Sequence, residues 1–453
     1  MTTFVSSIDN SPTMPNATAG RLTAMGVRHF VAITGVLALV CYVAIYTRPD
    51  ARLPLRSDGY SYYVYLPSWL LYRDVTLEAL ARDWYGGTYP PFTAIVRWAG
   101  TGRWVNPHPI GTAILMAPWF AAGHGLTRWS NLPPDGFSLY YQHAAGLAGV
   151  AYFLAGLAVL RQTLARHFSN GVVLATLVAI TWGTNLFHYG VFDSTFSHVY
   201  SFFLICVFIE LTEHWWAAPT LGCTWGLGLT AALIGLARHT NAIVLLILPL
   251  YGVTAWRDVR PRAVGLWQRR SSVAIMAGVA ILGVLPQWAI YKQATGSWLF
   301  FPYGGLDVGF TFRSPHLMGV LFSTQKGVFF WSPALLLAVV GMAAARGWAR
   351  NLVVPGAIVL VLDTYLIASW RDWQFGGSYG HRGFTDTFGL LAVFLAASFA
   401  WTAERPRRVR FVAAGAACAV ALSIIQMLQY WGGILPIANT TWAQYRALFL
   451  RFP

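Results

Sequence analysis

Charged residues are scarce in this chain. Only 10% of its 453 residues are Asp, Glu, Lys or Arg, whereas an ordinary soluble domain has about 25%. Hydrophobic residues make up 56% of the chain. This composition excludes a disordered protein and a water-soluble enzyme built on one large core. The few cysteines lie in apolar stretches without a CxxC motif, which excludes a disulfide scaffold; they are Cys41, Cys206, Cys223 and Cys418.

Long apolar runs are abundant instead, and they predict an all-α polytopic membrane protein. A helix needs about 20 apolar residues to cross a bilayer. About eleven stretches approach that length, which are 29–47, 139–160, 171–189, 196–213, 219–236, 240–256, 272–291, 328–345, 352–370, 386–403 and 410–430. The segment 110–126 is shorter and flanked by Pro and Gly. We expect it to be an interfacial helix.

The distribution of Arg predicts the topology. Lysine occurs only twice, so the formal charge of +15 comes from Arg. With the N-terminus in the cytoplasm, the Arg-rich segments 257–270 and 405–410 face inward, as the positive-inside rule requires. Sidedness therefore explains the charge, and we expect no nucleic-acid partner. A full span at 110–126 would turn these segments outward.

The expected organisation has a cytoplasmic tail, residues 1–28, and a transmembrane domain, residues 29–453. The outer face carries a large first loop, 48–138, with interfacial helices, and further loops at 292–327 and 371–385. Most acids fall in the outer loops, and no nucleotide-binding motif occurs. We therefore expect any chemistry on the outer face. One acid, Asp363, lies inside a predicted span and is a functional candidate for that reason.

Two acids lie close to predicted spans. Asp58 belongs to Arg-Ser-Asp-Gly-Tyr-Ser-Tyr-Tyr (56–63), where Gly59 allows a sharp turn that presents the carboxylate at the membrane surface. A solvated loop acid with an aromatic belt is the alternative. Asp193 belongs to Phe-Asp-Ser-Thr-Phe-Ser-His (192–198), a short loop before a span. It could cap that helix or bind a ligand at its N-terminus.

Basic residues form three further motifs. Arg238 lies in a hairpin, Ala-Arg-His-Thr (237–240), and needs an anionic partner, either a lipid phosphate or Asp193 or Asp363. The Gly-rich, aromatic segment 370–382 ends in His381 and Arg382 and could cradle an anion. Lys326 lies at the start of a span, where it binds an anion or anchors the interface.

Taken together, these motifs and their order resemble the GT-C superfamily of integral-membrane glycosyltransferases, which use polyprenyl-phosphate sugars. Asp58 matches the position of the family's first-loop catalytic acid, and Asp193 that of its second acid. Asn106 to Gly111 resembles the Pro-containing interfacial segment. Gly376 to Arg382 and Lys326 to Pro333 resemble stretches of bacterial members. The first-loop motif has one acid where many members carry an adjacent pair, and His108-Pro109 stands where others have Pro-Pro.

The resemblance implies an inverting hexosyl- or pentosyltransferase of the bacterial inner membrane with a periplasmic active site. It implies a polyprenyl-phosphate donor, a lipid-linked or cell-envelope glycan acceptor such as lipopolysaccharide, and contact with membrane lipids. Asp58 would be the catalytic base. The other implied site residues are Arg238, Arg382, Lys326 and His381 for the donor phosphate, Asp193 and His198 as the second acid and its neighbour for substrate or metal, and Tyr60, Trp84, Tyr85 and His108 for acceptor or sugar.

The sequence leaves alternatives open for both the cofactor and the function. No cofactor is certain, although Asp58 and Asp193 could hold Mg²⁺ or Mn²⁺. The main rival function is a transporter or flippase of a lipid-linked glycan, for which Asp363 would serve a substrate path. A third alternative, a glycan ligase or an acyltransferase, differs in its donor. An acyltransferase would need a nucleophile or an acid/base His in the membrane, such as His143 or His198, and no supporting motif surrounds either.

Overall fold

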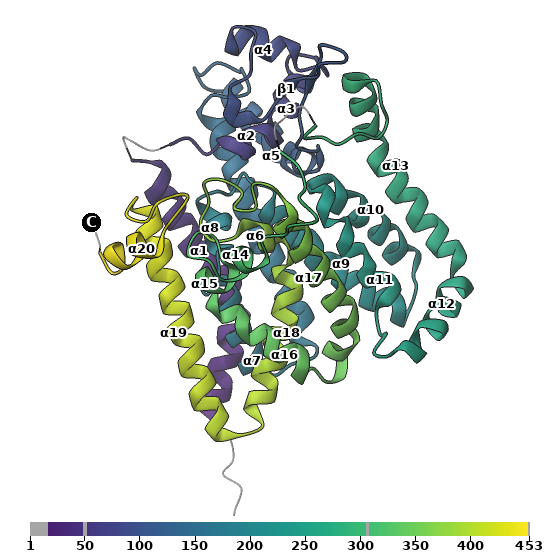
Figure 1. Ribbon diagram of the computed structural model, residues 1–453, viewed down its shortest axis with the longest axis vertical. Coiled ribbons are helices and arrows are strands. Elements are labelled where there is room, and N and C mark those ends of the chain that lie inside the picture. Colours follow the sequence, from purple (N-terminus) through teal and green to yellow (C-terminus); the bar gives the residue numbers. More distant parts are fainter. Residues whose placement is uncertain (1–16, 49–51, 305–307, 452–453) are drawn as a thin grey trace, which may run out of the picture.

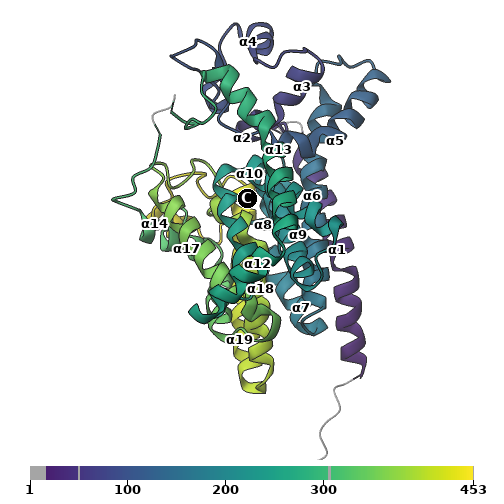
Figure 2. The same ribbon diagram turned by 90° about the vertical axis from the view of Figure 1, so that its right-hand side faces the viewer.

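The computed structural model describes residues 17–48, 52–304 and 308–451. Most of the expected N-terminal tail, residues 1–16, lies outside the described residues. The first helix begins at Ala17 and so includes residues 17–28, which we had expected in the tail. The chain folds into a bundle of helices, with the first loop assembled over one end of it (Figures 1 and 2).

Within the described residues, six helical segments are long and apolar enough to cross a membrane. Two of them include a leading 3-10 turn, η5 (Gly347–Leu352) before α17 and η6 (Arg382–Thr387) before α18. A multi-pass membrane protein is therefore supported, while the number of about eleven spans stays a prediction. The six are formed by α1 (Ala17–Tyr46), α6 (Leu139–Ala165), α13 (Arg270–Thr295), α17 (Val353–Ser369), α18 (Phe388–Ala403) and α19 (Pro406–Trp431).

The remaining apolar stretches form shorter or interrupted helices. The stretch expected at 171–189 breaks near Gly183, and the stretch at 328–345 breaks before Pro333, because proline disfavours a helical conformation at the residue before it. These helices are α7 (Asn170–Trp182), α8 (Leu186–Val191), α9 (His198–Ala217), α10 (Leu221–Ala237), η2 (His239–Leu246), α11 (Ile247–Leu250), α15 (Val328–Trp331), η4 (Pro333–Leu335) and α16 (Leu336–Ala344).

The first loop contains short helices and one small hairpin. The segment expected at the interface, 110–126, is helical as α5 and packs against α6. The hairpin pairs Val96 with Val105 and was not expected in an all-α chain. The elements are α2 (Ser57–Tyr63), α3 (Tyr65–Leu70), α4 (Glu78–Tyr85), η1 (Pro91–Thr93), β1 (Val96–Arg97), β2 (Trp104–Val105) and α5 (Gly111–Arg128).

Further helices complete the two ends of the bundle. The C-terminal helix α20 was not expected; it begins with a capping box in which Thr441 Oγ1 accepts from Gln444 N at 3.2 Å and Gln444 Oε1 accepts from Thr441 N at 2.9 Å. The Arg-rich 257–270 segment forms η3 and α12. These elements are η3 (Trp256–Asp258), α12 (Val259–Gln268), α14 (Leu317–Phe322) and α20 (Trp442–Leu448).

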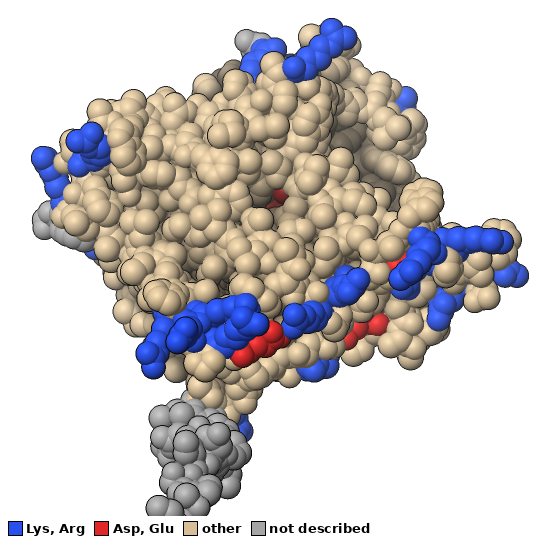
Figure 3. Space-filling model, turned by 60° about the horizontal axis from the view of Figure 1, so that its bottom comes forward, with Lys and Arg blue, Asp and Glu red and all other residues tan. Residues whose placement is uncertain are grey.

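Charge is distributed unequally between the two ends. Figure 1 places α12 and the turn between α18 and α19 at the end away from the first loop. Figure 3 shows a band of Lys and Arg across that end. The face above the band is almost uncharged, with one acidic side chain visible at the bottom of a hollow. The orientation of this basic end relative to a membrane stays a prediction.

Close backbone contacts fix the first loop on the bundle. A Cβ atom on Gly149 of α6 would lie 1.7 Å from the carbonyl oxygen of Ser194. A Cβ atom on Gly59 of α2 would lie 2.1 Å from Thr195 Oγ1. Only glycine permits such approaches. The segment 193–197 is therefore held between α6 and α2, and α2 carries Asp58.

Candidate active site

A cavity of about 490 Å³ lies between the first loop, the joint of α10 and η2, the segments 301–310 and 370–383, and α17. Charged side chains gather in its lining, among them Asp58, Arg238 and Arg382. The rest of the lining is mainly aromatic or aliphatic, with Phe301, Phe310, Leu366, Ile367 and Trp370. Its volume is typical of a small-molecule site, which in proteins spans about 300–1,000 Å³.

Asp58 is ionised and partly open in this cavity. Its Oδ2 lies 3.1 Å from Arg382 Nη2, and its side chain keeps 25% of its surface exposed against 13% for Arg382. Burial raises the pKa of the Asp58 carboxyl, but the surrounding positive charges, Arg382 above all, lower it more, so its pKa lies below the usual carboxyl value. The carboxylate can therefore accept a proton from a group that enters the cavity.

The start of α2 is strained and firmly held. Ser57, next to Asp58, has φ of 48°, a left-handed conformation that is costly for a residue with a Cβ. Just before it, Leu55 N donates to Gln142 Oε1 at 3.0 Å, and Thr195 Oγ1 donates to Pro54 O at 3.0 Å. These contacts fix the backbone that aims the Asp58 carboxylate into the cavity.

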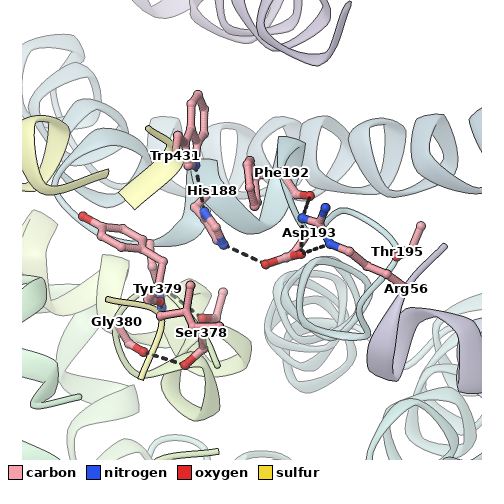
Figure 4. Close-up of polar contacts among 12 residues, drawn as sticks. Arg56, His188, Phe192, Asp193, Thr195, Ser378, Tyr379, Gly380 and Trp431 are labelled. Atoms are coloured by element: carbon pink, nitrogen blue, oxygen red, sulfur yellow. Dashed lines mark hydrogen bonds and ion pairs between the residues drawn. The ribbon is translucent and has the colours of Figure 1, made fainter. Parts of the chain in front are cut away.

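The Asp193 carboxylate is bound by two side chains, Arg56 and His188 (Figure 4). Arg56 reaches its Oδ1 from one side, with Nη2 at 2.8 Å and Nε at 3.2 Å. His188 Nε2 reaches Oδ2 from the other side at 2.9 Å. Burial raises the pKa of Asp193, but Arg56 and His188 lower it more, so its pKa lies well below the usual value.

The hydrogen bonds assign the tautomer of His188. Trp431 Nε1, which can only donate, lies 2.9 Å from His188 Nδ1. Nδ1 is thus the acceptor, and the Nε2 hydrogen points to Asp193. Arg56 Nη2 also donates to Phe192 O at 3.0 Å. The Asp193 carboxylate is therefore a fixed link between the first loop and α19, and our expectation that it binds substrate or metal is not supported by this geometry.

Arg238 faces the same cavity from the end of α10. Its Nε lies 3.4 Å from Asp386 Oδ2, so its partner is neither Asp193 nor Asp363, the two acids that the sequence suggested. Asp386 also bonds His198 Nδ1 at 2.8 Å and Asn241 Nδ2 at 2.9 Å. His198 is thus part of the support behind Arg238. It does not line the cavity, contrary to the role beside a second acid that we expected.

Lys326 and His381 do not line the cavity, and their binding of donor phosphate stays a prediction. Lys326 Nζ donates to the carbonyl oxygens of Ser378 and Ile437 and ties together three segments distant in sequence. Burial lowers the pKa of its ammonium group to about 7. The His381 ring is buried edge-on against Phe375, and burial lowers its pKa to about 3. A buried, neutral imidazole is poorly suited to bind phosphate.

Three of the four residues expected to contact acceptor or sugar do not line the cavity. Tyr60 and Tyr85 pack edge to face, and Trp84 packs on Phe137. Tyr60 and Tyr85 belong to the hydrophobic core, whereas Trp84 is 41% exposed. His108 does line the cavity, and burial lowers its pKa to about 4, so its ring is neutral at pH 7.

The carboxylates do not form a metal site in the structure. No group of three or more His, Cys, Asp or Glu within the described residues could hold an ion. Asp58 and Asp193 each have an Arg partner, at 3.1 and 2.8 Å. The arrangement does not fit Mg²⁺ or Mn²⁺, which prefer several free oxygen ligands.

Sequence reasoning missed several residues that organise the site. Tyr62 and Tyr303 line the cavity. Arg56 and His188 bind the Asp193 carboxylate, and Asp386 pairs with Arg238. Arg56 stood in the quoted motif beside Asp58, and Asp386 begins a predicted span. Neither position indicated a partner, because the contacts join residues far apart in the chain.

No protein-family model and no curated protein matches this chain. Its fold is similar to that of archaeal oligosaccharyltransferase AglB from Archaeoglobus fulgidus, solved with an inhibitory peptide and a dolichol-phosphate, at 11% identity and a TM-score of 0.49, over 93% of this chain and 58% of that one. The apo form of an Archaeoglobus fulgidus oligosaccharyltransferase matches at 12% identity and a TM-score of 0.44, over 88% and 55%. The chain thus spans little more than half the length of these structures.

Proposed function

We propose that the chain is a GT-C-type inverting glycosyltransferase that moves a hexosyl or pentosyl group from a polyprenyl phosphate to an envelope glycan or glycolipid. The reaction takes place on the outer, periplasmic face of a bacterial inner membrane. The donor is amphipathic, with a charged phosphate, a polar sugar and a long apolar chain. The acceptor offers a hydroxyl group.

The observation that carries this proposal is the lining of the 490 Å³ cavity. It combines three carboxylates, Asp58, Asp363 and Asp372, with two guanidinium groups, Arg238 and Arg382, and an aromatic and aliphatic wall. Guanidinium groups match phosphate in charge and hydrogen-bond geometry. An apolar wall accommodates the first units of a polyprenyl chain. A lipid-linked phosphate therefore fits this cavity better than a fully polar nucleotide does.

The proposed reaction is a single displacement. The acceptor oxygen forms a bond to the anomeric carbon as its proton passes to the Asp58 carboxylate. The bond between the anomeric carbon and the phosphate oxygen breaks, and its electron pair stays on the phosphate. Arg238 and Arg382 stabilise the charge that grows there. The configuration at the anomeric carbon inverts.

The ion pair between Asp58 and Arg382 prepares both side chains for this reaction. Before the donor binds, Arg382 keeps the carboxylate ionised. Donor phosphate competes for the guanidinium and frees one carboxylate oxygen for the acceptor hydroxyl. Arg238 stays oriented throughout, since Asp386 holds its Nε at 3.4 Å from behind.

The test is transfer of radiolabelled sugar by the purified chain and by Asp58→Asn. Each protein receives a panel of polyprenyl-phosphate monosaccharides and an extract of bacterial lipid-linked glycans. We expect transfer by the wild type and a loss of at least 100-fold in the variant, with donor binding retained. Asp83→Asn is the matched control, because Asp83 lies in the same loop, keeps 41% of its side chain exposed and does not line the cavity.

The transporter function would give a different outcome. A flippase moves lipid-linked glycan between leaflets of a vesicle and transfers no sugar. Movement of a fluorescent lipid-linked glycan by the wild type, without any sugar transfer to an acceptor in the extract, would replace the transferase proposal.

A further inference from the structure

Asp363 is an acid on an otherwise apolar face of α17. Leu366 and Ile367 of this helix line the cavity together with Asp363, and so does Trp370, which follows directly after the helix. The spacing of three and four residues places Leu366 and Ile367 on the same side of the helix as Asp363. Three of these four residues are apolar, as expected for a wall that faces a lipid chain. The carboxyl group interrupts that wall, and nothing in the proposed reaction uses it.

The carboxyl is buried deep in the cavity and incompletely paired. Asp363 lies six residues before the outer end of α17 at Ser369, about 9 Å along the axis. It is 7% exposed, and its Oδ2 has no hydrogen-bond partner among the described residues. A buried polar atom without a partner is costly. The cation near it, Arg238, is directed to Asp386 at 3.4 Å.

A ligand in the cavity that offers a hydrogen-bond donor would supply the missing partner. A lipid phosphate is a poor partner for this carboxyl group, because its oxygens are hydrogen-bond acceptors and its negative charge repels a carboxylate. A polyprenyl chain offers no hydrogen-bond donor. The sugar of the donor does, through its ring hydroxyl groups.

We infer that Asp363 binds a hydroxyl group of the sugar carried by the donor and thereby selects which sugar is transferred. The inference rests on the proposed function, because it assumes a polyprenyl-phosphate sugar in this cavity. It assigns the three parts of the donor to different walls. Arg238 and Arg382 bind the phosphate, the aromatic wall binds the chain, and Asp363 binds the sugar and orients it toward Asp58.

The first experiment compares binding of two lipids by the full-length chain in detergent, measured by tryptophan fluorescence. One lipid is bare polyprenyl phosphate, and the other belongs to a panel of polyprenyl-phosphate hexoses and pentoses. We expect the wild type to bind at least one sugar-bearing lipid more tightly than the bare lipid. Asp363→Leu should weaken that binding about 10- to 100-fold and leave the affinity for bare polyprenyl phosphate unchanged.

Two further variants separate this role from a structural one. Asp363→Asn keeps the shape and one hydrogen-bond acceptor, so it should lose less affinity than Asp363→Leu. Leu362→Ala changes the adjacent residue, which is 40% exposed and does not line the cavity, and should alter neither affinity.

Monodeoxy donors identify the hydroxyl. Removing the group that Asp363 binds should weaken binding to the wild type about as much as Asp363→Leu does, and should not weaken binding to that variant further. Removing any other hydroxyl should affect the two proteins equally.

Three results would overturn the inference. In the first, Asp363→Leu weakens bare polyprenyl phosphate as much as the sugar-bearing lipid. In the second, the wild type binds no sugar-bearing lipid better than the bare lipid. In the third, every deoxy donor loses as much affinity for the variant as for the wild type. Each of these leaves the proposed function standing if bare polyprenyl phosphate binds, whereas a wild type that binds no lipid phosphate contradicts both.

Discussion

The link between Asp193 and Arg56 offers the sharpest test of how the site is built. Asp193→Asn removes the charge that Arg56 contacts at 2.8 Å, in a pair whose side chains are only 9% and 21% exposed. It also turns an amide NH₂ toward Arg56 or toward the Nε2 hydrogen of His188, because Trp431 occupies the other ring nitrogen. Breaking one partner of such a pair costs about 3 kcal/mol of folding stability.

The effect on activity follows from the place of Arg56, two residues before Asp58. Without its anchor, the strained Ser57 backbone can relax and displace the Asp58 carboxylate, which we propose as the catalytic base. A displacement of about 1 Å can reduce a rate about 100-fold, or about 2.7 kcal/mol in the barrier. We therefore expect kcat to fall about 100-fold in Asp193→Asn, while the KM for donor stays within about twofold.

The assay measures transfer kinetics for Asp193→Asn, Arg56→Gln and the double variant, each checked for monodisperse folding. If Asp193 acts through Arg56, the double variant is no slower than the slower single variant. A loss equal to the product of the two single losses would refute this reasoning. So would a large rise in donor KM at unchanged kcat, because that is the signature of a residue that binds the donor.

Three other changes have defined outcomes. Gly149→Ala should prevent folding, seen as aggregation on size-exclusion chromatography, because its Cβ would meet a backbone oxygen at 1.7 Å; Gly171→Ala, where the Cβ meets nothing within 4 Å, should fold normally. The pKa of Lys326 is about 7 in the folded chain and about 10.5 when unfolded, so the unfolded state binds more protons between these values and stability should rise by about 1 kcal/mol per pH unit from pH 7 to 10. Lys326→Met should abolish that rise in thermal unfolding. Arg382→Gln should raise the pKa of Asp58 and move the acidic limb of the activity profile to higher pH, where an unmoved limb would contradict the pairing.

Local patterns in the sequence predicted many of the helices and part of the candidate site. Apolar runs of spanning length predicted the long helices, since a helix in lipid must satisfy its own backbone. The Arg-rich segments predicted which end is basic. Asp58 was recognisable because an acid followed by Gly59 lay shortly after a first apolar run, and Arg238 and Arg382 because a cation at membrane depth needs an anion.

Only the tertiary structure decided which charges remain free for a ligand. Arg56 and Asp193 are 137 residues apart in sequence, and Asn241 and Asp386 are 145 apart. No local spacing encodes such pairs, because they depend on which helices pack together. The same packing placed Lys326 on two carbonyl oxygens. The sequence thus determined where polar groups enter the membrane region, and the fold determined which of them face the cavity, because burial of a charge is tolerated only where packing supplies its partner.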